Sequence, residues 1–344
     1  MPHCTVSRGS SGIVVRQGQT TIALDPSRQA DCDITFVSHA HVDHLHKRSR
    51  NKNAEKKSQV IASKETCLIA GARGYCFTEP AECWEGLELV DTGHILGSRG
   101  LLVGDSMFYT GDISTRQRAF MKPARMPRAE TLIIESTFGR PEYVFPKLTE
   151  VEHKTNKIIS ENYDLGRPVI LMGYALGKAQ LLTKLFDHWD PLYVHDSVAT
   201  MNSVYSELGV KFKDVVTCSQ AEQQGLLAKE RPWIMVAPLM SGRSAFVRDM
   251  KARYNAVTVG FSGWATGERY RYMMGLDYAI PMSDHCDYNE LVDAVKKCAP
   301  SRVYTFHGFA KEFARSLRKM GFDARAVDED GHPAGSDATL DSFQ

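Results

Sequence analysis

Four side chains that bind metal ions lie within six residues of one another, in the run His39-Ala40-His41-Val42-Asp43-His44. The run follows the apolar segment 33–37, which we expect to form a strand, so the four side chains would lie on a turn at a strand end. Imidazole and carboxylate are preferred ligands of zinc. The alternative is a His-rich surface tract that binds metal incidentally. The spacing instead favours a two-metal site, with His39 and His41 facing one ion and Asp43 and His44 facing another.

Two further candidate ligands follow predicted strands. His94 lies between glycines in Gly93-His94-Ile95-Leu96-Gly97 and would supply a third nitrogen to the first ion. Asp112 follows the strand-like segment 107–110, where a carboxylate is placed to bridge two ions. A lone histidine after a strand is usually structural, and Gly-Asp is a common turn. The assignment of Asp112 therefore depends on its order and spacing after His94.

Four other candidates lie at predicted strand ends. Glu135 follows the apolar segment 131–134, and His285 and His307 follow the segments 278–282 and 302–306. Taken singly, each is more often structural than functional. Asp25 precedes Pro26, where it would either start a turn or support the metal-ligand loop.

The composition sets limits on the class of protein. The 344 residues are 43% hydrophobic and 24% charged, a globular composition that suits two domains or one domain with a large insertion. No apolar run approaches the length of a membrane span, and no secretory signal is visible, so we expect a soluble, cytoplasmic protein without a membrane partner. The eight cysteines contain no C-x-x-C pair and are expected to be reduced thiols.

Nucleic acid could be held by local groups only, because the formal net charge is +1. Six lysines and arginines fall between positions 47 and 57, next to the predicted metal ligands. Lys178 and Arg243 could bind phosphates, and Trp264 lies in a glycine-containing turn where it could stack on a base. Alternatively, the basic run is merely a solvated stretch of charge. The turns that contain Arg243 and Trp264 could likewise be ordinary loops between strands and helices.

Residues 145–271 alternate between predicted helices and strands, which is the pattern of a parallel α/β sheet. Together with the motifs, this pattern resembles one family. The run 39–44, the Gly-His-x-Leu-Gly-Ser string at 93–98 and Glu135-Ser136-Thr137-Phe138-Gly139 are similar to motifs of the metallo-β-lactamase superfamily, in its β-CASP nuclease branch. That branch includes RNase J, nucleases of mRNA 3′-end processing, Artemis-like repair enzymes and short bacterial and archaeal exonucleases.

The resemblance implies an α/β fold, namely a metallo-β-lactamase αβ/βα sandwich with an inserted β-CASP α/β cap domain. The expected boundaries are 1–144 and 272–327 for the sandwich, 145–271 for the cap and 328–344 for a C-terminal tail. Lys178 matches the position of an arginine in the cap's Gly-Arg-x-Gln element. Lysine offers phosphate a point charge where arginine offers a bidentate fork.

The resemblance also implies a role for each candidate. Two zinc ions would be bound by one set of ligands: His39, His41, Asp43, His44, His94, Asp112 and His307. Asp25 would support these ligands. Asp43, Glu135 and His285 would be catalytic, with His285 donating a proton while Glu135 holds it.

The predicted function is zinc-dependent hydrolysis of phosphodiester bonds in single-stranded nucleic acid. RNA is favoured, because in this family a histidine at the position of His307 accompanies RNA enzymes. The alternative is a DNA exonuclease or repair nuclease of the Artemis-like or ligase-associated type. Remoter alternatives are a small-molecule hydrolase of the same fold and a non-catalytic scaffold subunit. The sequence leaves the oligomeric state open, a homodimer included.

Overall fold

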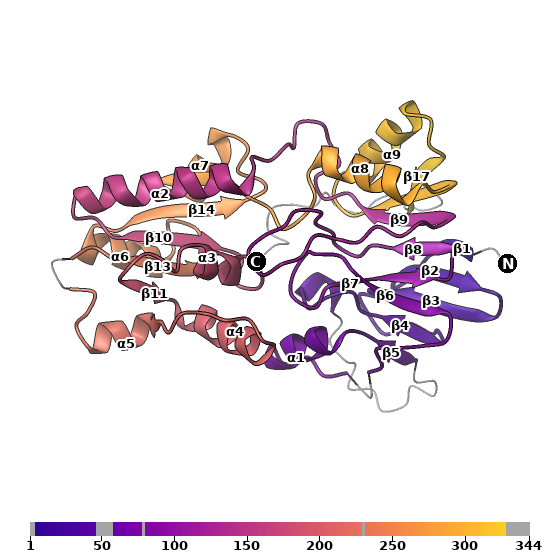
Figure 1. Cartoon of the computed structure of the whole chain (residues 1–344), viewed down its shortest axis with the longest axis horizontal. Helices are drawn as coiled ribbons and strands as arrows, with labels where there is room; N and C mark the ends of the chain where they lie inside the picture. The colour runs from indigo at the N-terminus through magenta and orange to yellow at the C-terminus, as the bar shows by residue number, and fades with distance from the viewer. Residues whose placement is uncertain (1–3, 46–57, 78–79, 229–230, 328–344) are drawn as a thin grey trace. The chain divides into compact units, whose positions relative to one another are not determined.

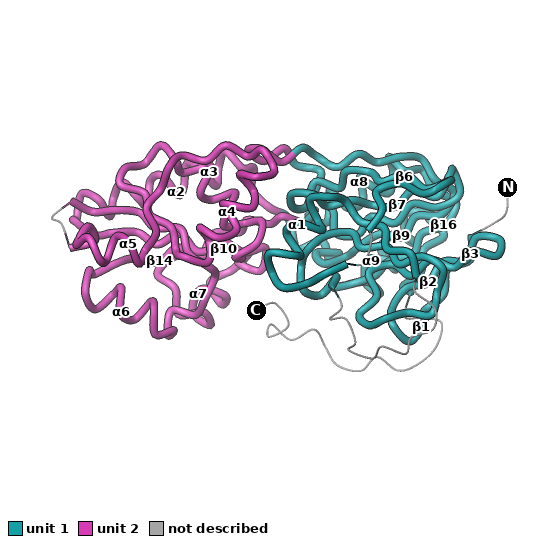
Figure 2. The backbone as a smooth tube through the Cα atoms, turned by 90° about the horizontal axis from the view of Figure 1, so that it is seen from below, with its two compact units in different colours: residues 1–116, 122–144, 285–344 teal, residues 117–121, 145–284 magenta. Residues whose placement is uncertain are grey.

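The computed structural model describes residues 4–45, 58–77, 80–228 and 231–327, which form two compact units (Figures 1 and 2). Unit 1 consists of Met1–Arg116, Lys122–Val144 and His285–Gln344, and unit 2 of Gln117–Met121 and Phe145–Asp284. The basic run at 47–57 and the predicted tail at 328–344 lie outside the described residues.

The division into units differs from the predicted boundaries at two places. Unit 2 extends beyond residue 271 to Asp284, because strand β15 (Tyr278–Pro281) pairs in parallel with β14 (Val257–Ser262). The segment Gln117–Met121 also belongs to unit 2, because the ring of Phe120 packs edge-on against Tyr205 and Phe212. Both differences depend on pairings between distant residues, which the local pattern does not show.

The first sheet of unit 1 has the strand order β1-β2-β3-β4-β5. Its strands are Cys4–Gly9, Gly12–Gln17, Thr20–Leu24, Ile34–Phe36 and Gln59–Ile61. Strands β2 and β3 form a hairpin, with Gln17 opposite Thr20 and a turn at Gly18, whose φ is +59°. Strands β3, β4 and β5 are parallel, so Asp25 after β3 and Ser38 after β4 lie at the same edge of the sheet.

The second sheet of unit 1 has the order β17-β16-β9-β8-β7-β6. In chain order, its strands are Leu87–Asp91 (β6), Arg99–Val103 (β7), Met107–Tyr109 (β8), Thr131–Glu135 (β9), Arg302–Phe306 (β16) and Ala324–Ala326 (β17). Strand β16 pairs in parallel with β9, with Phe306 opposite Glu135. This pairing brings His307 beside Glu135, although about 170 residues separate them in the sequence.

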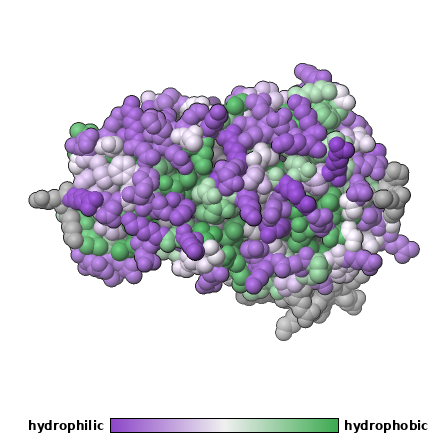
Figure 3. Space-filling view, viewed as in Figure 1, coloured by the Kyte–Doolittle hydropathy of each residue, from purple (hydrophilic) through white to green (hydrophobic). Residues whose placement is uncertain are grey.

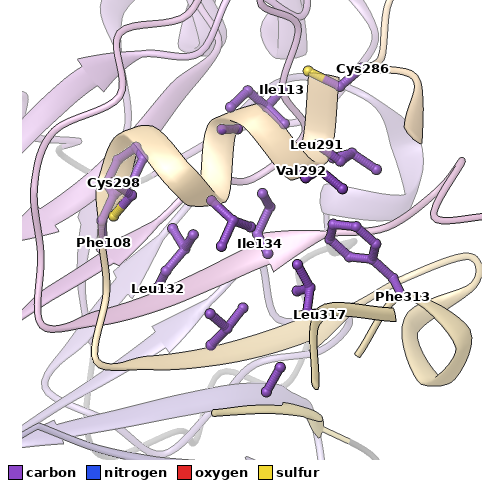
Figure 4. Packing of buried hydrophobic residues seen from close by; sticks show 14 of the residues in the cluster. Phe108, Ile113, Leu132, Ile134, Cys286, Leu291, Val292, Cys298, Phe313 and Leu317 are labelled. Atoms are coloured by element: carbon purple, nitrogen blue, oxygen red, sulfur yellow. The ribbon is translucent and has the colours of Figure 1, made fainter. Parts of the chain in front are cut away.

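The two sheets of unit 1 share a core. Val15 and Phe36 of the first sheet and Leu101 and Ile133 of the second belong to one buried cluster. The neighbours of Ile133 in β9 point to the opposite face. These neighbours, Leu132 and Ile134, belong to a second buried cluster, which lies under helices α8 (Tyr288–Cys298) and α9 (Ala310–Lys319). The cluster also includes Phe108, Leu291 and Leu317 (Figure 4). Helix α1 (Lys64–Ala72) also belongs to unit 1.

Unit 2 contains a parallel six-stranded sheet of order β12-β11-β13-β10-β14-β15, as the α/β pattern predicted. Its other strands are Val169–Gly173 (β10), Leu192–Val194 (β11), Val216–Thr217 (β12) and Ile234–Pro238 (β13). Its helices are Leu148–Asp164 (α2), Lys178–Leu185 (α3), Asp196–Glu207 (α4), Cys218–Gln223 (α5), Ala245–Tyr254 (α6) and Glu268–Met274 (α7).

Helices cover both faces of this sheet. Alternate residues of β10 enter two different clusters: Val169 and Leu171 pack with α2, α3 and α4, while Ile170 and Met172 pack with α5, α6 and α7. All five residues of β10 are buried, as expected for a central strand of a parallel sheet. Helix α5 ends at Gln223, because Gly225 adopts a positive φ of 66° and stops the helix.

On the face drawn in Figure 3, hydrophilic side chains cover most of the described residues and hydrophobic ones occur in small groups. Among the helices that the structure describes, none is both long and apolar enough to cross a membrane.

Candidate metal centre

Asp25 anchors the loop that carries the predicted metal ligands. Its Oδ1 accepts a hydrogen bond from the Ser38 backbone N–H at 2.6 Å. Its Oδ2 accepts from His44 Nδ1 at 2.7 Å and from the Tyr109 hydroxyl at 2.9 Å. The bond to His44 orients Nε2 of that imidazole away from Asp25. Asp25 thus has the geometry of a residue that supports a ligand from behind.

The first group of ligand atoms comes from three histidines and Asp112. His41 Nδ1 lies 3.0 Å from both His39 Nε2 and His94 Nε2. Asp112 Oδ2 lies 3.4 Å from His39 Nε2 and 3.5 Å from His94 Nε2. These four atoms lie within 4.8 Å of one another, so they could hold one metal ion. Burial, followed by the charge of His44, keeps the pKa of His39 well below its usual value, which favours the neutral imidazole that a metal requires.

The second group contains His44, Asp112 and His307. His44 Nε2 lies 3.4 Å from Asp112 Oδ2, and His307 Nδ1 lies 3.9 Å from Asp112 Oδ1. Asp43 Oδ2 is 3.6 Å from His44 Nε2, and its side chain is half-exposed. Asp112 is therefore common to both groups. Burial opposes its ionisation, but the charges of His44 and His285 hold its pKa well below its usual value.

The buried polar atoms of the site support the assignment to metal. Among the described residues, His44 Nε2 and Asp112 Oδ1 are buried and have no hydrogen-bond partner. Leaving such an atom unsatisfied costs about 1–3 kcal/mol. A cation placed in each group would give both atoms a partner. The donor set of imidazoles and carboxylates fits a first-row metal such as zinc.

Two glycines allow the loops to approach this closely. Gly93, directly before His94, has a φ of +69°, and a Cβ there would lie 2.5 Å from the Ser114 carbonyl oxygen. Gly111, directly before Asp112, has a φ of +55°, and a Cβ there would lie 2.6 Å from Ser38 Cβ. Any other residue would combine backbone strain with a clash. The glycines of both motifs are therefore part of the geometry of the site.

Glu135 and His285 form a pair beside the two groups. His285 Nδ1 lies 2.8 Å from Glu135 Oε1, while its Nε2 is 4.0 Å from Asp112 Oδ2. Glu135 is fully buried and also accepts hydrogen bonds from the backbone N–H groups of Ile113 and Thr137, at 2.9 and 3.2 Å. The pair thus directs Nε2 of His285 toward Asp112, which belongs to both groups of ligand atoms.

The backbone at His285 is fixed by contacts that the motif analysis missed. The Cys286 N–H donates to the Ile113 carbonyl at 2.7 Å. Asp287 and Glu290 form a reciprocal capping box at the start of α8. Arg116 binds both carboxylates, at 2.6 Å to Asp287 and 2.5 Å to Glu290. The Asp-x-x-Glu spacing signals the capping box in the sequence, whereas the partnership with Arg116 is visible only in the fold.

The three residues of unit 2 that were predicted to contact substrate, namely Lys178, Arg243 and Trp264, differ from one another in burial. Lys178 is 1% exposed, and its Nζ lies 3.1 Å from Asp284 Oδ1 and 4.6 Å from the centre of the Tyr174 ring. The ammonium group of Lys178 thus faces a buried carboxylate, and its predicted contact with phosphate stays a prediction. Arg243 is exposed, and Trp264 is half-buried and packs against the core of unit 2.

Comparisons with known proteins show relatives over much of the chain. The chain is 36% identical over 316 residues to a probable DNA ligase of Opitutus terrae, a match that covers 86% of this chain and 29% of that protein. It is 26% identical over 262 residues to an RNase J-like protein of Methanocaldococcus jannaschii, covering 63% of this chain and 62% of that one. It is 24% identical over 310 residues to the transcription termination factor FttA of Methanosarcina mazei, covering 69% and 48%.

The chain therefore spans less than two thirds of the length of each of these relatives. No family model matches it. A crystal structure of a protein of unknown function from Enterococcus faecalis superposes with a TM-score of 0.61 at 13% identity, covering 90% of this chain and 94% of that one, and so shares its fold. The chain is related to the metallo-β-lactamase nucleases of the β-CASP branch, as its motifs indicated.

The burial of Lys178 leads to a prediction about stability. Replacing Lys178 with Met keeps an apolar side chain of similar length but removes the charge that Asp284 faces. We expect the free energy of unfolding, measured by chemical denaturation, to fall by about 3–5 kcal/mol, as when one partner of a buried ion pair is lost.

Arg243→Met, at an exposed position of the same unit, is the control and should change stability by no more than about 0.5 kcal/mol. A Lys178→Met variant as stable as the parent, whose binding to nucleic acid loses about one unit of log-log salt slope, would instead support a phosphate contact.

Proposed function

We propose that the chain is a metal-dependent nuclease that hydrolyses phosphodiester bonds in nucleic acid. One observation carries this proposal: Asp112 is shared by two groups of metal-binding atoms, with the His285–Glu135 pair directly beside them. The names of the RNase J-like protein and the termination factor are consistent with it. In this proposal unit 1 is the metallo-β-lactamase sandwich and unit 2 is the β-CASP cap.

The proposed cofactors are two zinc ions. His39, His41, His94 and Asp112 would hold one, and His44, Asp43, Asp112 and His307 the other. Bound there, the ions would supply an activated water and stabilise the negative charge of the phosphoryl oxygens.

The side chains of this chain then have separate tasks. Asp43 or Asp112 would accept a hydrogen bond from the attacking water and so aim it at phosphorus. As the bond from phosphorus to the leaving oxygen breaks, His285 would donate the proton on Nε2 to that oxygen. Glu135 supports this role because its contact with Nδ1 leaves Nε2 directed toward the reacting groups.

RNA is the first candidate substrate, on the basis of the histidine at position 307. DNA is the second, and a specific observation favours it: the relative that matches 86% of this chain is named a probable DNA ligase. A small-molecule hydrolase would need neither the His285–Glu135 pair nor a separate unit 2, and a non-catalytic scaffold would not need an intact set of ligands. Arg243 is exposed, and we propose that it contacts a phosphate of the substrate. Trp264 would stack on a base of the nucleic-acid strand.

The metal content is the first test of this proposal. Purified protein should contain close to two zinc ions per chain, because the seven proposed ligands exceed what a single tetrahedral ion accepts. The measurement is elemental analysis of protein purified without chelator. Protein that lacks metal and cleaves nucleic acid equally well with and without chelator would exclude a metallonuclease.

The two late histidines should respond differently to replacement. His285→Ala should retain the metal and lower kcat by roughly a hundredfold to ten-thousandfold, which is the usual contribution of a proton donor. His307→Ala should lose metal, because it removes a proposed ligand of the second ion. Metal analysis and kinetics on the same preparations distinguish the two roles. An equal loss of metal from both variants would refute the division.

The substrate is tested directly with end-labelled single strands of one sequence, made as RNA and as DNA. We expect metal-dependent cleavage of at least one, faster for RNA if the first candidate is right. The products also distinguish stepwise removal of nucleotides from internal cleavage. Faster cleavage of DNA would select the second candidate, and no cleavage of either by metal-loaded protein would contradict the proposed function.

A further inference from the structure

We propose that Phe138 is a positioning residue for His285, and that a column of stacked side chains, Tyr143, Phe309 and Arg140, holds Phe138 in place. This inference rests on the proposed function of His285 as the proton donor. It concerns side chains of unit 1 that belong neither to the proposed metal ligands nor to the His285–Glu135 pair.

The His285–Glu135 hydrogen bond alone does not fix the imidazole. It holds one ring atom, Nδ1, and leaves the ring able to tilt about that point. A tilt would move Nε2, the atom that faces the metal groups. Contacts on the ring itself limit such a tilt. The His94 ring is one of them, with its centroid 4.4 Å from that of His285. A geometric error of about 1 Å in such a group can cost roughly a hundredfold in rate.

Phe138 supplies a contact of this kind. It follows strand β9 three residues after Glu135 and is 2% exposed. Its ring meets the His285 ring edge to face, with centroids 6.0 Å apart and planes at 74°. This is a favourable arrangement for aromatic pairs. Because Phe138 is buried, its ring is not available to stack on a nucleobase, so its effect must pass through the residues it touches.

The column that supports Phe138 extends away from His285. The Tyr143 ring lies 5.2 Å from the Phe138 ring, and Phe309 stacks on Tyr143 at 5.4 Å with planes at 22°. The Arg140 guanidinium lies 4.1 Å from the centre of the Phe309 ring and pairs with Glu312 of α9. Each ring of the column thus rests on a neighbour that is itself held.

The column also joins the loops of the two late histidines. Phe309 lies two residues after His307, and its N–H donates to the Ser136 carbonyl at 2.8 Å. The Ser136 hydroxyl donates to the carbonyl oxygens of Phe306 and His307, at 2.7 and 2.9 Å. A displacement of the loop after β9 would therefore move both His285, the proposed proton donor, and His307, a proposed metal ligand. The column of stacked rings resists such a displacement.

The leaving group distinguishes positioning of a proton donor from a general loss of structure. An oligonucleotide needs a proton on its leaving oxygen, whereas an aryl phosphodiester such as bis(4-nitrophenyl) phosphate releases 4-nitrophenolate without one. We expect Phe138→Leu to keep its metal and its KM and to lose roughly tenfold to a hundredfold in kcat on the oligonucleotide. On the aryl ester its kcat should stay within about threefold of the parent, as should that of His285→Ala.

Three further variants complete the comparison. Tyr143→Phe keeps the ring of the column and should behave as the parent, while Tyr143→Leu should resemble Phe138→Leu. Phe108→Leu removes a fully buried ring from the helix-covered face of the second sheet (Figure 4) and should leave the ratio of the two activities unchanged. An equal loss of both activities in Phe138→Leu, with metal retained, would overturn the proposal.

A measurement independent of activity protects the inference from failure of the proposed function. In zinc-loaded protein labelled with 15N-histidine, the ring signals of His285 are assigned by their absence in His285→Ala. We expect Phe138→Leu to shift or broaden these signals and Tyr143→Phe to leave them unchanged. Unchanged His285 signals in Phe138→Leu would overturn the positioning role. If the wild-type protein hydrolyses neither substrate but the His285 signals are altered in Phe138→Leu, the proposed nuclease function is refuted. The inference that Phe138 positions the His285 ring is then still supported.

Discussion

The carboxylate of Asp25 is the interaction on which the site depends. It binds the backbone and hydroxyl of Ser38, the His44 imidazole and the Tyr109 hydroxyl. Ser38 and His44 belong to the ligand loop after β4, while Tyr109 ends β8 of the other sheet. One buried carboxylate therefore fixes both the loop and its register against the second sheet. Without it, the convergence of ligands from separate strands would lack a common reference point.

A second constraint is the concentration of charge around Asp112. Its carboxylate is buried among the imidazoles of both groups, and burial alone would favour its neutral form. The neighbouring His44 and His285 nevertheless lower the pKa of Asp112 well below its usual value, which favours the ionised carboxylate that a metal ligand requires. The burial of His39 and the exposure of His307 show that the two groups differ in their access to water. The first group is accordingly the more enclosed of the two.

The local pattern of the sequence was sufficient for most elements and for the ligands that follow strands. Apolar segments at 131–134 and 302–306 predicted strands, and Glu135 and His307 lie at their ends in the structure. The pattern could not show what Lys178 faces, because Asp284 is more than a hundred residues away along the chain. For the same reason it did not show the contacts of Arg116 or the pairing of Tyr278–Pro281 with β14. Pairwise contacts of buried charges and sheet edges are set by topology and not by periodicity.

The insertion of unit 2 between the two halves of unit 1 fixes the order in which the ligands are synthesised. The first group is complete once residue 112 has been made, whereas the second waits for His307, after the whole of unit 2. At translation speeds of about 5–20 residues per second, roughly 10 to 40 seconds separate the two events. During that interval strand β9 lacks its neighbour β16, so one edge of the second sheet is open until the last part of the chain arrives. The candidate ligands of the first group are thus all present in the nascent chain before those of the second.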